Sequence, residues 1–317
     1  MMTAHSFLVQ PAAPFDFEAT SENQPYFRKG QEDGSDSYRR LLDLEGTLAL
    51  ATVQFNGDAS SPELRVELAG NELTKPEVSL ARAQIEKLLG TGQDLRPFYE
   101  SASEDPVMAN LVETFYGMHQ TLSLSVFETI AQAILGQQLS ASVARVIRAL
   151  MIETYGPRLT VQGETHYAFP RPREIAEAGV AELRGMKLSQ RKAEYLHGLA
   201  LAELETPGGL DRVAVLPDEE VIKEVTSLRG VGMWSAQWVM SRALGRPDAF
   251  PIGDLALRRI VSQLYFGGEA LTDAELADYS LRWAPFRSLA TSYLFAALRT
   301  GKGQEVTVSG SSACTPG

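Results

Sequence analysis

The chain has 317 residues, of which 44% are hydrophobic and 22% are charged, and its formal net charge at pH 7 is −11. This composition is typical of a soluble globular protein, and the length allows two domains. A single cysteine, Cys314, excludes an intramolecular disulfide framework and a cysteine-ligated iron–sulfur cluster, which needs about four thiolates. The sequence holds no apolar stretch long enough to span a membrane and no signal peptide, so we expect a cytoplasmic protein.

The first third of the chain predicts a small mixed domain. Residues 1–35 are rich in Pro, Ser and acidic side chains at several points, and we expect them to be partly irregular. From Ser37 onward β-forming residues dominate, and Asn56-Gly57 and Gly70-Asn71 interrupt them as hairpin turns do. The apolar residues of the next segment, 76–90, repeat along one face of a helix. Residues 36–105 are therefore predicted to form an N-terminal α+β domain.

The rest of the chain predicts helices joined by short connections that contain Gly or Pro. The expected helices span residues 106–118, 124–135, 140–155, 172–178, 180–185, 189–205, 218–227, 233–244, 254–265, 273–282 and 286–299. Residues 301–317 have few bulky apolar groups, and we expect a disordered tail there. The predicted fold class is α+β, with a small sheet-and-helix domain followed by an all-helical domain over residues 106–300.

The most informative segment is residues 228–254, LRGVGMWSAQWVMSRALGRPDAFPIGD. Gly230 and Gly232 favour a sharp reversal, because glycine reaches positive φ at little cost. The helix expected after them begins with unpaired N–H groups, which form a site suited to a phosphate. An ordinary turn between two helices is the alternative interpretation. Asp254 closes the segment, and its place before LALRRIVSQL also suits a helix N-cap.

This segment resembles the helix-hairpin-helix, Gly/Pro-rich loop and aspartate signature of the base-excision DNA glycosylase superfamily. Within that superfamily the chain is most similar to the alkylation-repair branch, the DNA-3-methyladenine glycosylase II type. Two further segments carry the resemblance: FETIAQAILGQQLSASVARVI at 127–147 and FPRPREIAEAGVAELRGMKLSQRKAEYLHGLA at 169–200. The resemblance implies a helix-hairpin-helix glycosylase domain over residues 106–300. It also implies that residues 36–105 form a sheet domain like half of the TATA-binding-protein fold.

The resemblance implies that Asp254 is the catalytic carboxylate. Cleaving a base from deoxyribose builds positive charge on the sugar, which an ionised carboxylate stabilises while it orients or deprotonates a water. Trp234 stands where the bifunctional branch of the superfamily has a lysine that attacks the sugar, and an indole cannot form a Schiff base. We therefore expect a monofunctional glycosylase in which water is the nucleophile.

Trp234 and Trp238 lie four residues apart and so share one face of the predicted helix. The resemblance implies that both wall the pocket for an extruded base, where stacking contributes about 1–3 kcal/mol per base. A cation–π attraction would further favour a positively charged alkylated purine. Trp283, in RWAPFRS, is expected to add a third pocket aromatic. Core packing is the alternative interpretation for all three indoles.

The segment Gly136-Gln137-Gln138-Leu139 interrupts two predicted helices. A side chain commonly fills the gap that an extruded nucleotide leaves in the base stack. The resemblance places this wedge at Gln138, but the apolar side chain comes one residue later, at Leu139, so both are candidates. Gln137 is expected to line the pocket. A plain helix linker is the alternative interpretation.

The resemblance implies that the partner is double-stranded DNA with damaged bases. We also expect the protein to be a monomer. The net charge of −11 does not exclude this partner, because residues 221–265 hold six basic and three acidic side chains. The expected DNA contacts are Arg229, Gly230, Val231, Gly232, Gln138, Leu139 and Lys187. Lys187, together with Arg191 and Lys192, is equally well explained as a solvated basic face.

The hairpin of this superfamily also tends to bind a structural Na⁺ or K⁺, for which the carbonyls of Leu228 and Val231 are the candidates. We expect no other cofactor, and the four histidines are too scattered for a metal site. Two other classes of function remain open. One is a non-catalytic helix-hairpin-helix DNA-binding protein, and the other is a bifunctional glycosylase/lyase that uses another lysine.

Overall fold

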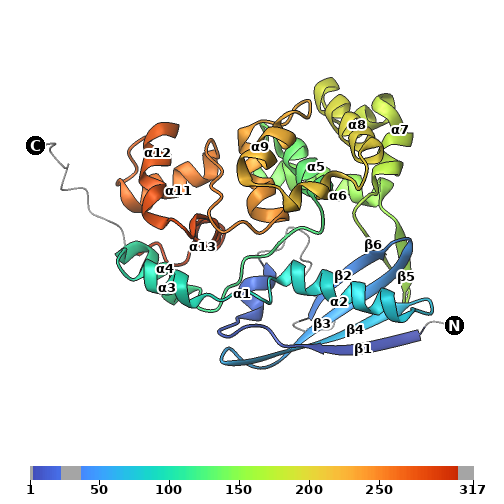
Figure 1. Ribbon diagram of the computed structural model, residues 1–317, viewed down its shortest axis with the longest axis horizontal. Coiled ribbons are helices and arrows are strands. Elements are labelled where there is room, and N and C mark those ends of the chain that lie inside the picture. The colour runs from blue at the N-terminus through green and yellow to red at the C-terminus, as the bar shows by residue number, and fades with distance from the viewer. Residues whose placement is uncertain (1–2, 23–36, 306–317) are drawn as a thin grey trace, which may run out of the picture.

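A computed structural model describes residues 3–22 and 37–305 of the chain. Figure 1 shows a twisted antiparallel sheet with a helix lying along it, next to a larger body of helices. The sheet has four strands in the order β1-β4-β3-β2. Their bounds are β1 Thr3–Val9, β2 Ser37–Leu44, β3 Thr47–Asp58 and β4 Ser61–Gly70. This arrangement confirms the predicted α+β class.

The helix on the sheet is α2, Lys75–Leu89, and its ends follow from its sequence. Thr74 and Glu77 form a reciprocal capping box at its start, and Gly90 ends it at a φ of 59°. Ala81, Ile85, Leu88 and Leu89 recur on one face and pack against buried residues of the strands.

The first residues of the chain differ from the expected irregular segment. Thr3–Val9 forms strand β1, which pairs antiparallel with β4 from Thr3 opposite Gly70 to Val9 opposite Leu64. A short helix, α1, Phe17–Glu22, follows it. The partner strand of β1 lies far along the chain, so local composition did not reveal the pairing. The rest of the expected irregular segment, residues 23–36, lies outside the described residues.

The helical part packs around two cores. The first is built by α5 Val126–Gly136, α6 Ala141–Tyr155, α7 Pro172–Gly185, α8 Gln190–Glu205, α9 Asp218–Thr226 and α10 Met233–Trp238. The second is built by α3 Arg96–Ala102, α4 Pro106–Thr114, α11 Leu255–Tyr265, α12 Asp273–Ser280 and α13 Arg287–Thr300. In Figure 1 the helices α3 and α4 accordingly lie beside α13, which is distant from them in sequence.

Two helices carry irregularities. Gly179, at a φ of 66°, breaks α7 between the two helices expected at 172–178 and 180–185. The helix expected at 233–244 is α-helical to Trp238 and continues as a wider π turn over Val239–Ala243. A further short 3₁₀ helix, Leu210–Val215, was not expected.

A β-hairpin between α6 and α7 was also not expected. Strands β5, Arg158–Val161, and β6, Glu164–Tyr167, pair antiparallel. Val161 and Ala168 pack with Leu41 and Leu50 of the large sheet, so the hairpin belongs by contact to the N-terminal part. The sequence boundary near residue 105 remains a prediction, because this hairpin makes contacts across it.

The start of the expected disordered tail packs against helices. The Gly303 carbonyl accepts a hydrogen bond from Asn110 Nδ2 at 2.9 Å, and Gln304 Nε2 donates to the Ala297 carbonyl at 2.7 Å. Residues 306–317 lie outside the described residues. Among the helices that the structure describes, none is long and apolar enough to cross a membrane.

Candidate active site

Asp254 is the N-cap of α11, and its carboxylate accepts three N–H groups. Oδ1 accepts from the backbone of Ala256 at 2.9 Å and of Leu257 at 3.0 Å. Oδ2 accepts from Trp234 Nε1 at 3.0 Å. Asp254 and Trp234 are both partly exposed. A carboxylate offers about four acceptor positions, so one position on Oδ2 remains open.

Asp105 is a second aspartate with almost the same surroundings. It caps α4 through Val107 and Met108, and its Oδ2 accepts from Trp283 Nε1 at 3.2 Å. At Asp105, however, Tyr265 also donates its hydroxyl to Oδ2 at 3.0 Å. A cap with an indole donor is therefore a structural unit that this fold uses twice. What distinguishes Asp254 is the acceptor position that no described donor fills.

Aromatic rings from two helices form a wall next to Asp254. Trp234 and Trp238 meet edge to face, with ring centroids 6.3 Å apart and planes at 78°. Phe295 of α13 packs on Trp238 with centroids 5.7 Å apart. The predicted pair of indoles is thus brought together on α10, and Phe295 is a third aromatic that the sequence analysis missed. The available signal was weak: an aromatic residue between small and aliphatic residues of the last helix.

Arg242 lies behind this wall. Its guanidinium carbon is 5.4 Å from the centre of the Trp238 ring, and Nη1 donates to the Thr121 carbonyl at 3.1 Å. Burial, together with the nearby positive charge of Arg299, lowers the pKa of Arg242 to about 10. The indole N–H of Trp238 is buried and has no hydrogen-bond acceptor among the described residues. The wall is therefore polar at its back as well as aromatic.

The structure places Trp283 in the second core. Its side chain is 4% exposed and packs against Phe250, Tyr265 and Tyr279. With its N–H bound to Asp105, it supports the α4–α11 packing and presents no exposed face. The core interpretation of this residue fits the structure better than the pocket interpretation.

The two hairpin glycines differ. Gly230 has a φ of 86°, and a β-carbon there would lie 2.3 Å from the ring of Tyr195. Gly232 has a φ of −109° and is exposed, with no atom within 4 Å of an added β-carbon. Only Gly230 thus makes the turn that requires glycine, whereas Gly232 leaves the backbone before α10 open to a ligand.

The residues after α5 approach the same hairpin. Gln137 donates from Nε2 to the Gly230 carbonyl at 2.9 Å, so its side chain binds the hairpin backbone. Gln138 is exposed at a φ of 57°, a left-handed conformation that is uncommon outside glycine. Leu139 is 37% exposed. Both wedge candidates therefore protrude, and the structure does not choose between them.

Both basic side chains expected at DNA, Arg229 and Lys187, are exposed. Arg229 is 74% exposed and pairs with Glu194 at 2.9 Å, above the ring of Tyr195. Lys187 is exposed at a φ of 65°. Lys192 instead turns inward, where its ammonium donates to the Leu135 carbonyl at 2.9 Å and burial lowers its pKa.

One of the two hairpin carbonyls expected at a cation, that of Leu228, accepts a hydrogen bond within the protein. Leu228 O accepts the Val231 N–H at 3.1 Å, and a carbonyl oxygen has a second lone pair. Within the described ranges, no three His, Cys, Asp or Glu side chains lie close enough together to hold a metal ion. The monovalent cation at Leu228 and Val231 therefore stays a prediction.

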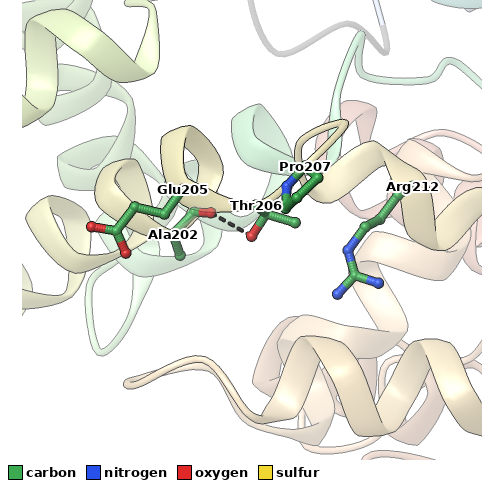
Figure 2. Close-up of a pocket in the computed structure, with 5 residues that line it drawn as sticks. All are labelled: Ala202, Glu205, Thr206, Pro207 and Arg212. Carbon is green, nitrogen blue, oxygen red and sulfur yellow. Dashed lines mark hydrogen bonds between the residues drawn. The ribbon is translucent and has the colours of Figure 1, made fainter.

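Two surface hollows lie apart from Asp254 and the aromatic wall. Figure 2 draws the residues that line the first of these, an open hollow: Ala202, Glu205, Thr206, Pro207 and Arg212. Its volume is about 600 Å³. A smaller one of about 120 Å³ shares Thr206 and Arg212 and reaches Leu228. Neither is lined by Asp254 or by the aromatic wall.

The sequence and the fold match known proteins. Residues 131–285 match the model of the HhH-GPD superfamily of base excision DNA repair proteins. A DNA-3-methyladenine glycosylase of Bacillus subtilis is 31% identical over 207 residues, which are 65% of this chain and 68% of that protein. DNA-3-methyladenine glycosylase 2 of Escherichia coli is 30% identical over 172 residues, 54% of this chain and 57% of that protein. The 3-methyladenine DNA glycosylase structure from Archaeoglobus fulgidus superposes with a TM-score of 0.81 at 30% identity and covers 92% of this chain and 98% of its own.

The hairpin, the capped aspartate and these matches define a base excision DNA repair protein of the glycosylase class. The chain belongs to the HhH-GPD superfamily. It is similar to enzymes that hydrolyse N-glycosyl bonds, and it is an enzyme of that type.

Proposed function

We propose that this chain is a monofunctional DNA glycosylase that removes alkylated bases from double-stranded DNA. The substrates are 3-methyladenine, 7-alkylguanine and related bases, and the products are the free base and an abasic site. The relatives named for 3-methyladenine support the substrate class. The observation that carries the proposal is the Asp254 carboxylate, held by three N–H groups beside an aromatic wall with one acceptor position unfilled.

In the proposed reaction the damaged nucleotide is extruded and the bond from its base to C1′ breaks, with the electron pair leaving on the base. Positive charge develops on the sugar, and a fixed carboxylate stabilises it because no reorganisation is needed when the charge appears. A water oxygen then bonds to C1′, and its proton leaves toward the open position of Asp254 and on to solvent. Trp234 keeps the carboxylate oriented through its N–H.

The proposed base site is the wall of Trp234, Trp238 and Phe295. Stacking on an aromatic face favours any planar base, and a positively charged base gains a cation–π attraction as well. Arg242 already lies over the Trp238 ring. Two cations on one ring compete, so the attraction for a charged base would come mainly from Trp234.

A base-release assay tests the proposal. A duplex treated with a methylating agent is incubated with the protein, and released 3-methyladenine is measured. The wild type should release it, and Asp254→Asn should bind the duplex normally but excise at least about 100-fold more slowly. Asp105→Asn is the matched control, since it changes the other capped aspartate and should keep the wild-type rate. Wild-type excision by Asp254→Asn would exclude the catalytic role.

Base release and borohydride trapping together separate the two other classes of function. A non-catalytic DNA-binding protein would release no base. A bifunctional enzyme would form a covalent adduct with DNA that borohydride traps, and the presence of Trp234 in place of a lysine supports the prediction that none forms. We further propose a monomer that works on damaged duplex DNA in the cytoplasm and holds Na⁺ or K⁺ at the hairpin.

A further inference from the structure

The C-terminal end of α5 is held by a side chain from another helix. Three of its last four carbonyls accept N–H groups from the turn that follows, residues 137–139. The fourth, Leu135 O, accepts from Lys192 Nζ of α8 at 2.9 Å. The end of a helix leaves carbonyls unpaired and favours a cation, so Lys192 completes the end of α5. The turn that leaves α5 is thereby tied to α8.

One turn further along α8, Tyr195 supports the hairpin. Its ring lies so close beneath Gly230 that a β-carbon at that position would be 2.3 Å away. Lys192 and Tyr195 are three residues apart, so they share one face of α8. The same helix face therefore contacts both the end of α5 and the tip of the hairpin.

Gln137 connects these two elements directly. At the end of α5 its backbone N–H donates to the carbonyls of Ala133 and Ile134. Its side-chain Nε2 donates to the Gly230 carbonyl at 2.9 Å. This hydrogen bond joins residues 93 positions apart in the sequence. The next residue, Gln138, is exposed in the left-handed region, a strained conformation that persists only where the surroundings enforce it.

We propose that Gln137, Lys192 and Tyr195 form a clasp that positions the exposed turn Gln138–Leu139 relative to the hairpin. The clasp fixes the distance between the turn and the hairpin. When the hairpin binds the DNA strand, the turn is therefore placed to insert into the base stack next to the bound phosphate, so that strand binding and base extrusion are coupled. Gln137 is in this view a positioning residue that acts through the hairpin carbonyl and through the turn. The inference rests on the proposed function, because it assigns the clasp to base extrusion.

The test uses Gln137→Leu, which removes the donor, and Lys192→Met, which removes the ammonium but keeps the stem. Lys192→Arg should rescue, because a guanidinium can still donate to Leu135 O. Gln132→Leu is the matched control: Gln132 is also on α5 but donates to Glu128 instead of the hairpin. Thermal midpoints of all variants show whether each one is folded at the assay temperature.

Single-turnover excision on methylated duplex is measured together with the fluorescence of 2-aminopurine placed beside a tetrahydrofuran abasic analogue. Gln137→Leu and Lys192→Met should lower the excision rate and the 2-aminopurine fluorescence change at least tenfold, while the affinity for undamaged duplex stays within twofold of the wild type. Lys192→Arg should recover to within threefold, and Gln132→Leu should stay within twofold of the wild type. Signals unchanged by Gln137→Leu and by Lys192→Met would overturn the clasp.

A double-mutant background separates positioning from a merely structural role. In Gln138→Ala/Leu139→Ala protein there is no wedge to position, so adding Gln137→Leu should cost no more than twofold. A further tenfold loss there would overturn the proposal. If the wild type excises nothing, the proposed function fails, and binding to the tetrahydrofuran duplex decides the clasp. Tenfold weaker binding by Gln137→Leu supports it, and equal binding overturns it.

Discussion

At the scale of single residues, Trp234 combines two contacts that are usually made by separate side chains. Its ring stands in the aromatic wall against Trp238, and its N–H holds Oδ2 of Asp254. The ring contact needs only an aromatic plane, whereas the second contact needs a donor. The two contributions can therefore be separated by substitution.

Trp234→Phe keeps the plane and removes the donor. We expect kcat for base excision to fall about tenfold, which is about 1.4 kcal/mol, with KM little changed, because the carboxylate loses one of its three orienting bonds. Trp283→Phe is the control, since it removes the same kind of bond at Asp105 and should leave kcat unchanged. Steady-state kinetics on a methylated duplex measures both. An unchanged kcat in Trp234→Phe would mean that the indole serves only as a stacking surface.

Asp254, Trp234 and Trp238 were expected together because the short motif that contains them resembles the superfamily signature. Helix spacing decides there which side chains share a face. Phe295 reaches the wall from α13, and which face of α13 meets α10 depends on the packing of the second core. Gln137 was expected to line the pocket, but its amide binds the hairpin, and nothing in its local sequence indicates a partner so distant.

At the scale of elements, the two glycines of the hairpin differ in why glycine is present at each position. Gly230 is required by its positive φ and by the Tyr195 ring beneath it, while Gly232 has an extended backbone in open space. A methyl group added at each position should therefore have different effects on folding.

Gly230→Ala should lower the free energy of unfolding by about 1–3 kcal/mol, because the residue must hold a left-handed backbone and displace a ring. Gly232→Ala should change it by no more than about 0.5 kcal/mol. Urea unfolding followed by circular dichroism measures both values. Equal losses in the two variants would contradict this account of the hairpin.

Most helices were predicted to within a few residues, since apolar spacing and capping residues mark them locally. The break of α7 followed from Gly179 alone. The β5–β6 hairpin was not predicted. In the structure Gln162 and Gly163 form its turn, and both adopt positive φ. Its strands are four residues each and are stabilised by the large sheet, so their own sequence gives little indication of them.

At the scale of the whole molecule, a buried ion pair joins the sheet to the helical part. Arg40 of β2 lies 3.2 Å from Glu128 of α5, and the two side chains are 7% and 5% exposed. A pair buried so deeply contributes little compared with an apolar pair, but removing one partner leaves a charge in a medium that solvates it poorly. Glu128 stands on the helix whose other end carries the clasp.

Arg40→Met should therefore lower the free energy of unfolding by about 3–5 kcal/mol. Arg40→Met/Glu128→Met should be more stable than Arg40→Met alone, because no charge remains buried. The control is Arg173→Met in the exposed pair with Glu177, where we expect a loss below about 1 kcal/mol. Guanidinium unfolding measures all three. A double variant as unstable as the single one would show that packing, not charge, explains the loss.

The β5–β6 hairpin constrains how such a chain can be shortened. The hairpin lies between two helices in the sequence, but its apolar residues Val161 and Ala168 pack against Leu41 and Leu50 of the sheet. A fragment that begins at residue 106 would carry the hairpin without the surface that shelters it, and the sheet alone would lose its cover. A protein that lost the N-terminal part would therefore also have to lose the β5–β6 hairpin or replace its apolar residues by polar ones. The two parts of the chain are thus expected to be retained together in evolution.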